Sequence, residues 1–362
     1  MDVTLVAGVD PFSPRASGIR THIMGLAGAL GRLGHDVTIV GTGRLQGELP
    51  VWNFVPVTRE SRVSSFRFLA ALHRKARRIP IHGNVVHAHR ADDLTAFGSR
   101  KDLLARILTV HGLSTKGIAQ RHGRVVSSMY LRFEKAAMRL ADRVLALDRE
   151  TLSSLRSRYP EQSAKFLMGS GGVDLSLFAP MPRSEARREL GLQDRPTIAY
   201  LGRLVREKNL PVFMEALDSL PTVQVIVAGD GPLREDVEAW GRRRKLFRFL
   251  GRLPHDRVSI ALNAANVLAL PSLWEAMPSI CLESLACGTP VVATRVGGLD
   301  EVIRPGTNGL LVDAEPKRFA AALDHVLATS EEMRTESRRS VEGYGWDSVA
   351  ERLVEIYRQA TA

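Results

Sequence analysis

Short and almost entirely apolar runs alternate with longer amphipathic segments along the first half of this sequence. A helix with Ile19, Ile23 and Leu30 on one face is expected to end near Leu33. Apolar runs separated by helices are typical of a parallel sheet that is covered on both faces. The strands predicted in this way are Val3–Asp10, Val37–Gly41, Asn84–His89, Arg106–Gly112 and Arg143–Asp148.

The alternation breaks off and then starts again. Residues 179–193 contain Pro180 and Pro182 and end in a short predicted helix, so we interpret them as an interdomain linker. A length of 362 residues is typical of about two domains. We therefore predict an α/β protein with two doubly wound sheets. The strands predicted for the second sheet are Thr197–Arg203, Val223–Gly231, Phe247–Leu253, Asn266–Ser272 and Pro290–Thr294.

The composition is that of an ordinary soluble globular protein, with 44% hydrophobic and 25% charged residues. No apolar run approaches the roughly 18 residues that a membrane-spanning helix needs. The first residues lack a basic region before their apolar run, so we interpret them as a strand and not as a signal peptide. We therefore expect a cytoplasmic protein. Cys281 and Cys287 lie on one predicted helix, and we expect two buried apolar residues, not a disulfide or a metal site.

The net charge of +11 is compatible with nucleic acid, an anionic membrane or a phosphorylated substrate as partner. Aromatic residues are not interleaved with the basic ones, so the sequence does not predict a nucleic-acid surface. The segment 62–80 carries six basic residues and no acidic residue among Phe66, Phe68, Leu69 and Leu72. Such a segment fits peripheral contact with an anionic membrane on the inner face. An ordinary surface helix with a solvated basic face is the alternative.

Two glutamates lie eight positions apart in the segment Pro271–Pro290. Pro278 and Gly288 predict a helix between them, because proline suits the first turn and glycine the residue after the last. Glu275 is then expected at the carboxyl end of a strand, and Glu283 in the following helix. Carboxylates accept hydrogen bonds from hydroxyl groups, and the start of a helix attracts anions. The combination of hydroxyl and phosphate suggests a sugar nucleotide, with the amides of Met277, Ser279 and Ile280 facing the same crevice.

Cationic and glycine residues follow several of the other predicted strands. Arg203 and Lys208 come after the first strand of the second half, where a pair of cations fits a diphosphate, although solvated loop charges are the alternative. Gly229 belongs to a turn-forming cluster, and Gly18 opens the first helix, where it would admit a ligand to the backbone. Because the first loop has no GxGxxG fingerprint, a dehydrogenase is disfavoured.

Histidines cluster near two strand ends of the first half. His87 and His89 lie two positions apart and therefore share a face of their strand. No carboxylate or cysteine at a recognisable spacing completes a metal site, so we expect core or crevice histidines there. His111 ends the next predicted strand and is the better candidate for a functional residue. His22, on the first helix, is expected to be structural.

In this order, the motifs resemble those of the retaining glycosyltransferases of family 4, and the resemblance extends over nearly the whole chain. The glutamate pair with its proline and serine flanks is the strongest piece. Gly171, Ala276, Ser284 and Ser17 stand where the family often has Asn, Gly, Ala and Gly. Because alanine is less flexible than glycine, Ala276 would restrict the loop that would hold the sugar. The matching segments read SGIRTHIMGLAGALGRLGHDVTIV, GGVDLSLFAP, YLGRLVREKN, VIVAGDGPL, FLGRLPHDRV, LPSLWEAMPSICLESLACGTPVVAT and GGLDEVIRPGTNGLLV.

The resemblance implies the GT-B fold, in which two Rossmann-like domains face each other. An acceptor domain would cover residues 1–180 and a nucleotide-sugar domain residues 181–340. The helix within residues 341–362 would return to the first domain. The implied activity is transfer of a sugar from a nucleoside diphosphate sugar, of UDP or GDP type, to an acceptor hydroxyl with retention of configuration. The family needs no metal ion or other cofactor.

The resemblance also implies roles for individual residues. Arg203 and Lys208 would bind the diphosphate and stabilise the leaving group, and His111 would contact the transferred sugar. Glu275 would accept hydrogen bonds from the sugar ring, and Glu283 from the ribose. The remaining donor-binding residues would be Gly18, Gly202, Gly229, Arg252, Leu253, Met277, Ser279 and Ile280.

The basic segment favours a lipid-linked or envelope glycan as acceptor, while a soluble small molecule stays open. The alternatives are a sugar-nucleotide epimerase or phosphorylase on the same fold, and a non-catalytic sugar-nucleotide-binding or membrane-docking subunit. The linker motif and the glutamate spacing argue against the first alternative. The intact set of Arg203, Lys208, Glu275 and Glu283 argues against the second.

Overall fold

The computed structural model describes residues 1–13, 18–46, 51–81, 85–112 and 114–362, with the backbone alone for 114–126. The chain forms two compact units. The first unit comprises Met1–Gly172 and Trp346–Ala362, and the second comprises Val173–Gly345. The division thus lies before the boundary that we expected after residue 180, and the chain re-enters the first unit at Trp346 instead of 341.

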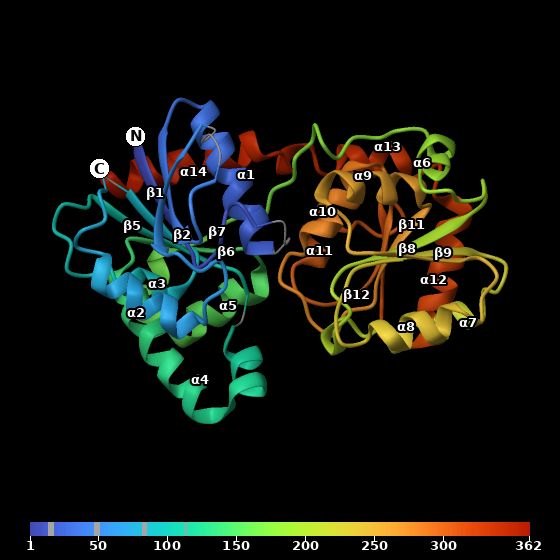
Figure 1. The fold of residues 1–362 in the computed structure, drawn as a ribbon, viewed down its shortest axis with the longest axis horizontal. Helices are drawn as coiled ribbons and strands as arrows, with labels where there is room; N and C mark the ends of the chain where they lie inside the picture. Colours follow the sequence, from blue (N-terminus) through green and yellow to red (C-terminus); the bar gives the residue numbers. More distant parts are fainter. Residues whose placement is uncertain (14–17, 47–50, 82–84, 113) are drawn as a thin grey trace. The chain divides into compact units, whose positions relative to one another are not determined.

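The first unit holds a seven-stranded sheet in which all strands are parallel, in the order β3-β2-β1-β4-β5-β6-β7 (Figure 1). Apolar residues from alternate positions of the strands form one core on each face, as expected for a doubly wound sheet. The strands are β1 (Asp2–Val6), β2 (Asp36–Thr42), β3 (Asn53–Thr58), β4 (Val85–Ala88), β5 (Ala105–Val110), β6 (Arg143–Ala146) and β7 (Phe166–Met168).

Helices cover both faces of this sheet. One core receives side chains from α2, α3, α4 and α5, and the other receives them from α1 and α14. Helix α14 lies along α1. The two helices are joined by an ion pair in which a guanidinium nitrogen of Arg32 lies 2.6 Å from Oδ1 of Asp347. The helices are α1 (Gly18–Arg32), α2 (Ser65–Lys75), α3 (Ala91–Thr95), α4 (Ser114–Leu140), α5 (Arg149–Arg158), the 3₁₀ helix η1 (Pro160–Lys165) and α14 (Trp346–Thr361).

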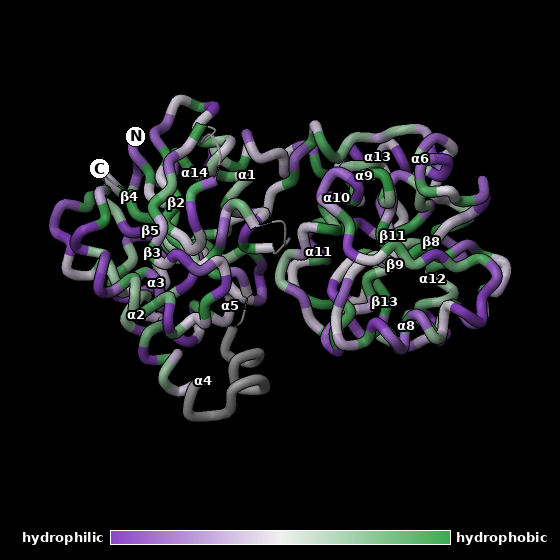
Figure 2. The backbone as a smooth tube through the Cα atoms, viewed as in Figure 1, coloured by the Kyte–Doolittle hydropathy of each residue, from purple (hydrophilic) through white to green (hydrophobic). Residues whose placement is uncertain are grey.

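The second unit holds a six-stranded parallel sheet in the order β10-β9-β8-β11-β12-β13. It again has a core on each face, and Figure 2 shows hydrophobic residues gathered along its strands. The strands are β8 (Thr197–Leu201), β9 (Gln224–Ala228), β10 (Phe247–Gly251), β11 (Val267–Leu270), β12 (Val291–Thr294) and β13 (Gly309–Val312).

Helices α6, α9 and α10 contribute to one core of the second unit, and α7, α8 and α12 contribute to the other. Two parallel sheets covered by helices on both faces confirm the predicted fold class. The helical segments are α6 (Arg183–Glu189), η2 (Arg206–Lys208), α7 (Leu210–Asp218), α8 (Arg234–Gly241), α9 (His255–Ala264), α10 (Ser279–Ala286), α11 (Leu299–Val302), α12 (Pro316–Thr329), α13 (Arg334–Arg339) and η3 (Glu342–Tyr344).

The three strands that the sequence analysis did not predict all lie at the edge of a sheet. They are β3 and β7 in the first sheet and β13 in the second. β3 contains Pro56, which an edge strand tolerates because one side of it needs no hydrogen bonds. β7 is three residues long, and β13 buries only alternate residues. An edge strand is less enclosed than a central one, although β10, which also lies at an edge, was predicted.

The two cysteines are both buried and free, as the sequence predicts. Cys281 lies within α10, and Cys287 is the residue that ends it. Burial raises the pKa of Cys287 to about 12, so its side chain is a neutral thiol at physiological pH. Both side chains serve as small apolar groups in the core of the second unit.

Candidate active site

An ion pair spans the point at which the strand order of the second sheet reverses. Strands β8 and β11 are neighbours at this point. β9 and β10 follow beyond β8, and β12 and β13 follow beyond β11. Lys208 follows β8, Glu275 follows β11, and the Lys208 ammonium pairs with Glu275 Oε1. In open α/β sheets, ligands bind beyond the carboxyl ends of the strands at this reversal. The side chains are only 17% and 10% exposed, so water screens their charges weakly.

Glu275 is held in one orientation by its surroundings. Ser272 Oγ donates to Glu275 Oε1 over 2.7 Å, so this oxygen has two partners. Thr294 in turn donates to the carbonyl of Ser272. Glu275 Oε2 has no hydrogen-bond partner among the residues that the structure describes. The carboxylate therefore offers one oxygen to a ligand.

The loop that carries Glu275 lies against the turn after β12. Gly297 has a φ of 57°, and a Cβ atom at this position would lie 2.0 Å from the carbonyl oxygen of Glu275. The amide of Gly298 donates to the carbonyl of Ala276 over 2.8 Å. Only glycine allows the two backbones to approach this closely.

Backbone hydrogen bonds hold the carboxyl ends of β8, β9 and β10 together. Gly202 N donates to Ala228 O over 3.0 Å, and Gly229 N donates to Gly251 O over 2.8 Å. Gly229 has a φ of 145°, and a Cβ atom there would lie 1.8 Å from Gly202 O. The three glycines leave the edge of the sheet without side chains that would block a ligand.

Arg203 extends from this edge with an exposed side chain. The hydroxyl of Tyr200 donates to the carbonyl of Arg203 over 2.8 Å and fixes the backbone there. Burial, with a contribution from the charge of Glu275, raises the pKa of Tyr200, so its hydroxyl stays protonated and able to donate. Arg252 is exposed and Leu253 is half-buried beyond the end of β10.

The helix α10 begins where the sequence predicts. Pro278 is its N-cap residue, and the first N–H groups of a helix, here those of Ser279 and Ile280, have no carbonyl partner within it. Glu283 lies in this helix, is 5% exposed, and has its Oε1 3.3 Å from Nε2 of His255. Its Oε2 has no partner among the described residues. Glu283, like Glu275, thus has one committed and one uncommitted oxygen.

The remaining predicted residues belong to the first unit. Gly18 is the exposed first residue of α1, and a Cβ atom there would meet open space. Ser17 lies outside the described residues. His111 follows β5, and its Nε2 lies 3.0 Å from Nδ1 of His89. Burial lowers the pKa of His111 to about 4, so its imidazole is neutral at physiological pH.

His87 is a core histidine, as predicted. Its Nδ1 lies 2.7 Å from the hydroxyl of Tyr357 on α14, and its Nε2 lies 2.7 Å from Thr109 Oγ1. Both ring nitrogens therefore have partners within the first unit. Burial lowers the pKa of His87 to about 3, so it bridges β4, β5 and α14 as a neutral ring.

Sequence reasoning missed three residues that shape the site of the second unit. Ser272 orients Glu275, His255 contacts Glu283, and Gly297 lets the loop of Glu275 close. The sequence did contain signals for two of them. Ser272 stands three positions before Glu275, and Gly297 belongs to a glycine pair that follows a predicted strand. No signal marked His255, because its partner lies 28 residues further along the chain.

Comparison with known proteins gives matches along almost the whole chain. Residues 16–177 match the model described as Glycosyltransferase Family 4, and residues 182–343 match Glycosyl transferases group 1. The D-inositol 3-phosphate glycosyltransferase of Geodermatophilus obscurus is 30% identical, over 80% of this chain and 70% of the relative.

Solved structures share the fold. Sucrose-phosphate synthase from Thermosynechococcus elongatus has a TM-score of 0.85 and 24% identity, over 99% of this chain and 98% of that one. Anabaena HepE in complex with UDP-glucose has a TM-score of 0.76 and 16% identity, over 99% of this chain and all of the other. Two Rossmann-like units with this site at a strand reversal define a nucleotide-sugar glycosyltransferase of the GT-B type. The chain belongs to glycosyltransferase family 4.

Proposed function

We propose that this protein transfers a sugar from a nucleoside diphosphate sugar to an acceptor hydroxyl, with retention of configuration and without a metal ion or other cofactor, in the cytoplasm. The observation that carries the proposal is the Lys208–Glu275 pair at the strand reversal of the second sheet. It sets a cation for phosphate beside an acceptor for sugar hydroxyls.

Lys208 and Arg203 supply the positive charge that the diphosphate needs. An ammonium group has three donors, and Glu275 takes one of those of Lys208. The others remain for phosphate oxygens, and the exposed guanidinium of Arg203 follows the same strand. Negative charge grows on the diphosphate as the sugar leaves, so fixed cations stabilise the transition state more than the bound substrate.

The two glutamates hold the ends of the donor. The uncommitted oxygen of Glu275 accepts from hydroxyls of the transferred sugar, and that of Glu283 accepts from the ribose. The amides of Met277, Ser279 and Ile280 face the phosphates at the start of α10. Gly202 and Gly229 admit the donor to the backbone, and Arg252 and Leu253 meet the base.

Gly18 and His111 belong to the first unit, and the roles proposed for them are those that the resemblance implies. With His111 neutral, its ring is available as a hydrogen-bond partner for a hydroxyl group without adding charge. Retention follows when the acceptor attacks on the face from which the diphosphate departs and the departing phosphate takes its proton. The UDP-glucose complex of HepE supports a donor of the UDP type, with GDP as the alternative.

We expect UDP-glucose or a related UDP or GDP sugar to raise the midpoint of thermal unfolding, because a ligand at 100 times its Kd stabilises the folded state by about 2.7 kcal/mol. The free sugar and the nucleoside monophosphate serve as controls. Glu283→Gln should weaken the shift, since the ribose loses a charged acceptor. Products are then identified by mass spectrometry, and their anomeric configuration by NMR, with and without a chelator.

A panel in which no nucleotide sugar shifts the midpoint or yields a product contradicts the proposed activity. Inverted configuration contradicts retention, and turnover that the chelator abolishes contradicts independence from metal. For the acceptor we favour a soluble small molecule, in keeping with the inositol phosphate named for the relative from Geodermatophilus obscurus.

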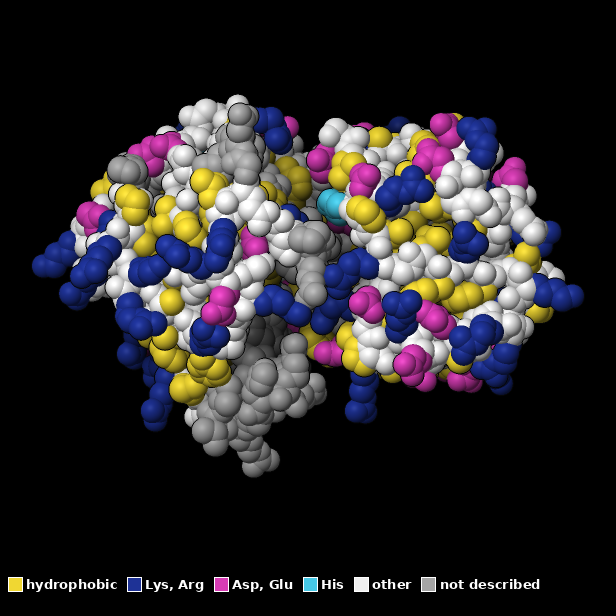
Figure 3. All heavy atoms as spheres, viewed as in Figure 1, with side chains coloured by type: hydrophobic (Ala, Val, Ile, Leu, Met, Phe, Trp, Pro, Cys, Tyr) yellow, Lys and Arg dark blue, Asp and Glu magenta, His cyan; other side chains and the backbone are white. Residues whose placement is uncertain are grey.

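A membrane-borne acceptor is a second candidate because of α2 and the residues after it. Phe68, Leu69 and Leu72 of this helix are buried, and Phe68 and Leu72 belong to a core of the first unit, so its apolar face is not free to enter a membrane. Its other face is exposed and basic, and Figure 3 shows Lys and Arg side chains gathered over α2. Phe66 is 52% exposed on the same helix. No helix among the described residues is long and apolar enough to cross a membrane.

On this second candidate, replacing Arg74, Arg77 and Arg78 with glutamine should weaken binding to vesicles that contain anionic lipid. Each basic residue near such a surface contributes about 1 kcal/mol, so the loss should be about 10²-fold. The matched control replaces Arg242, Arg243 and Lys245, three exposed basic residues of the second unit. Cosedimentation measures the binding. A parent protein that does not bind the vesicles contradicts this candidate.

A further inference from the structure

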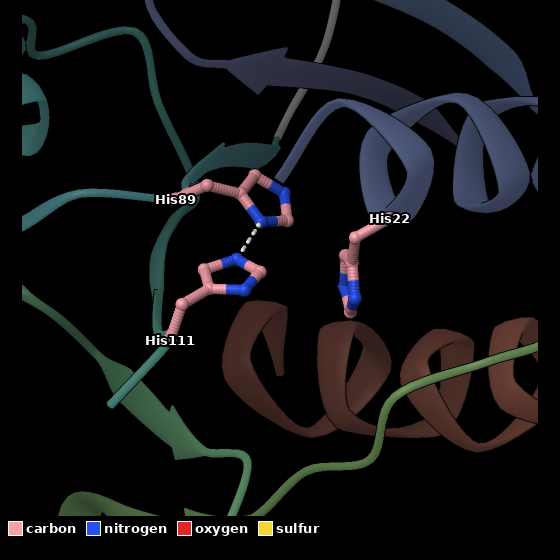
Figure 4. A group of neighbouring side chains, drawn as sticks. All are labelled: His22, His89 and His111. Atoms are coloured by element: carbon pink, nitrogen blue, oxygen red, sulfur yellow. Dashed lines mark hydrogen bonds between the residues drawn. The ribbon is translucent and has the colours of Figure 1, made fainter. Parts of the chain in front are cut away.

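Three histidines from separate elements meet at the carboxyl edge of the first sheet. His22 lies on α1, which follows β1, while His89 follows β4 and His111 follows β5. The strand order of this sheet reverses between β1 and β4. Figure 4 shows the rings of His89 and His111 one above the other, with the ring of His22 standing to one side of them.

The ring nitrogens of this cluster are close enough to share one ion. Each histidine offers one nitrogen, and the three nitrogens lie within 4.8 Å of one another. His89 Nδ1 and His111 Nε2 lie 3.0 Å apart. Two nitrogen ligands at about 2.0–2.1 Å from a tetrahedral zinc ion lie roughly 3.3 Å apart. Small rotations of the side chains therefore bring the three nitrogens to coordination distance.

The three rings carry free electron pairs at physiological pH. Burial lowers the pKa of His22, His89 and His111, and charges on neighbouring histidines lower the pKa of His22 and His89 further. Neutral imidazole is the form that binds a metal. His89 Nε2 is buried and has no hydrogen-bond partner among the described residues, so no second bond fixes this ring. His87 has partners at both nitrogens and is therefore a neighbour of the cluster, not a ligand.

We propose that His22, His89 and His111 together bind one divalent transition metal ion, with zinc as the ion that fits best. Three histidines with a fourth position open to water form an established ligand set for zinc. His111 is the partly exposed member of the cluster, while His22 and His89 are buried. Nitrogen ligands suit zinc, while magnesium and calcium prefer oxygen, which this set does not offer. Binding here uses His111, for which the proposed function gives a contact with the transferred sugar, so the test reads metal binding itself and not the transfer of sugar.

Cobalt(II) is the probe that tests this site in the full-length protein after treatment with a chelator. We expect one equivalent of cobalt to give visible absorption bands of a tetrahedral site, and zinc to abolish them by displacement. Zinc should also raise the midpoint of thermal unfolding, because an ion that binds only the folded state stabilises it. Magnesium should do neither.

His22→Ala and His111→Gln should each weaken cobalt binding at least about tenfold, since each removes one of three ligands. His111 is only partly buried, so His111→Gln keeps the test valid if His22→Ala does not fold. His325→Gln, on an exposed face of α12, is the matched control and should bind as the parent does. The proposal is overturned if the parent shows no tetrahedral bands, or if His111→Gln binds cobalt as tightly as the parent.

Discussion

Lys208→Ala is expected to lower turnover by about 10²–10³-fold, the usual effect of removing one preorganised group that faces developing charge. Its ammonium lies at the strand reversal of the second sheet and is only 17% exposed. A cation from solution does not replace the ammonium group of Lys208, because placing a free ion in the site costs translational entropy. Initial rates of nucleoside diphosphate release, at saturating donor, measure this loss.

Arg206→Ala is the matched control, because Arg206 lies on the same short helix η2 and its side chain is exposed. It should retain the turnover of the parent. Glu275→Gln should also lower turnover, since it weakens both the contact with Lys208 and the acceptor for the sugar. The double variant Lys208→Ala/Glu275→Gln leaves no unpaired charge and separates lost catalysis from lost stability. Turnover close to the parent in Lys208→Ala contradicts the assignment of this site.

The first unit is expected to lose stability steeply as the pH falls from 7 to 5. His22, His87 and His89 are buried and His111 is partly buried, and burial lowers the pKa of each below the ordinary value of 6.5. Their contribution to stability is therefore complete above pH 6.5 and is lost as the pH falls toward the folded-state pKa values. Each proton that only the unfolded chain binds costs about 1.4 kcal/mol per pH unit.

Asp93 opposes this trend. Burial raises the pKa of its carboxyl to about 8, so its contribution to stability is complete below the unfolded value and is lost as the pH rises through about 8. The unfolded histidines are fully protonated only near pH 5, where one opposing proton leaves a net of three, or about 4 kcal/mol per pH unit; near pH 7 the net slope is close to zero. Typical total stability is about 5–15 kcal/mol. Acid should therefore unfold the first unit before the second.

Hydrogen exchange followed by mass spectrometry measures this effect separately in each unit. We expect amides of β4, β5 and α14 to lose protection between pH 7 and 5, after correction for the intrinsic exchange rate. His87→Gln should reduce the pH dependence by about one proton, while His325→Gln, at an exposed position of the second unit, should not change it. Protection of the first unit that is independent of pH between 7 and 5 contradicts the prediction.

The central strands of both sheets could be predicted from the sequence because each is buried on both faces. Leu5 and Val6 of β1, for example, point into different cores, and both are fully buried. A strand in this position has no polar face, so its sequence is a continuous apolar run. The edge strands β3, β7 and β13 lack that enclosure, and local sequence did not distinguish them from loops.

The residues predicted for the donor site also lie where strands of the second sheet end. Arg203, Gly229, Arg252 and Glu275 follow β8, β9, β10 and β11. Parallel strands present all their carboxyl ends at one edge, so residues that follow different strands meet there without any signal of mutual contact. The sequence therefore indicated which residues gather, although not which of them touch.

The sequence by itself determined the two parallel sheets, the helix that carries Glu283, and the edge at which the residues predicted for the donor site lie. Only the tertiary structure decided the contacts between them. Lys208 and Glu275 are 67 residues apart, and the strand order that makes β8 and β11 neighbours brings them together. His22, expected to be structural, joins His89 and His111 because α1 follows β1, which pairs with β4. Such contacts depend on strand order and helix packing, which a local pattern of residue types does not encode.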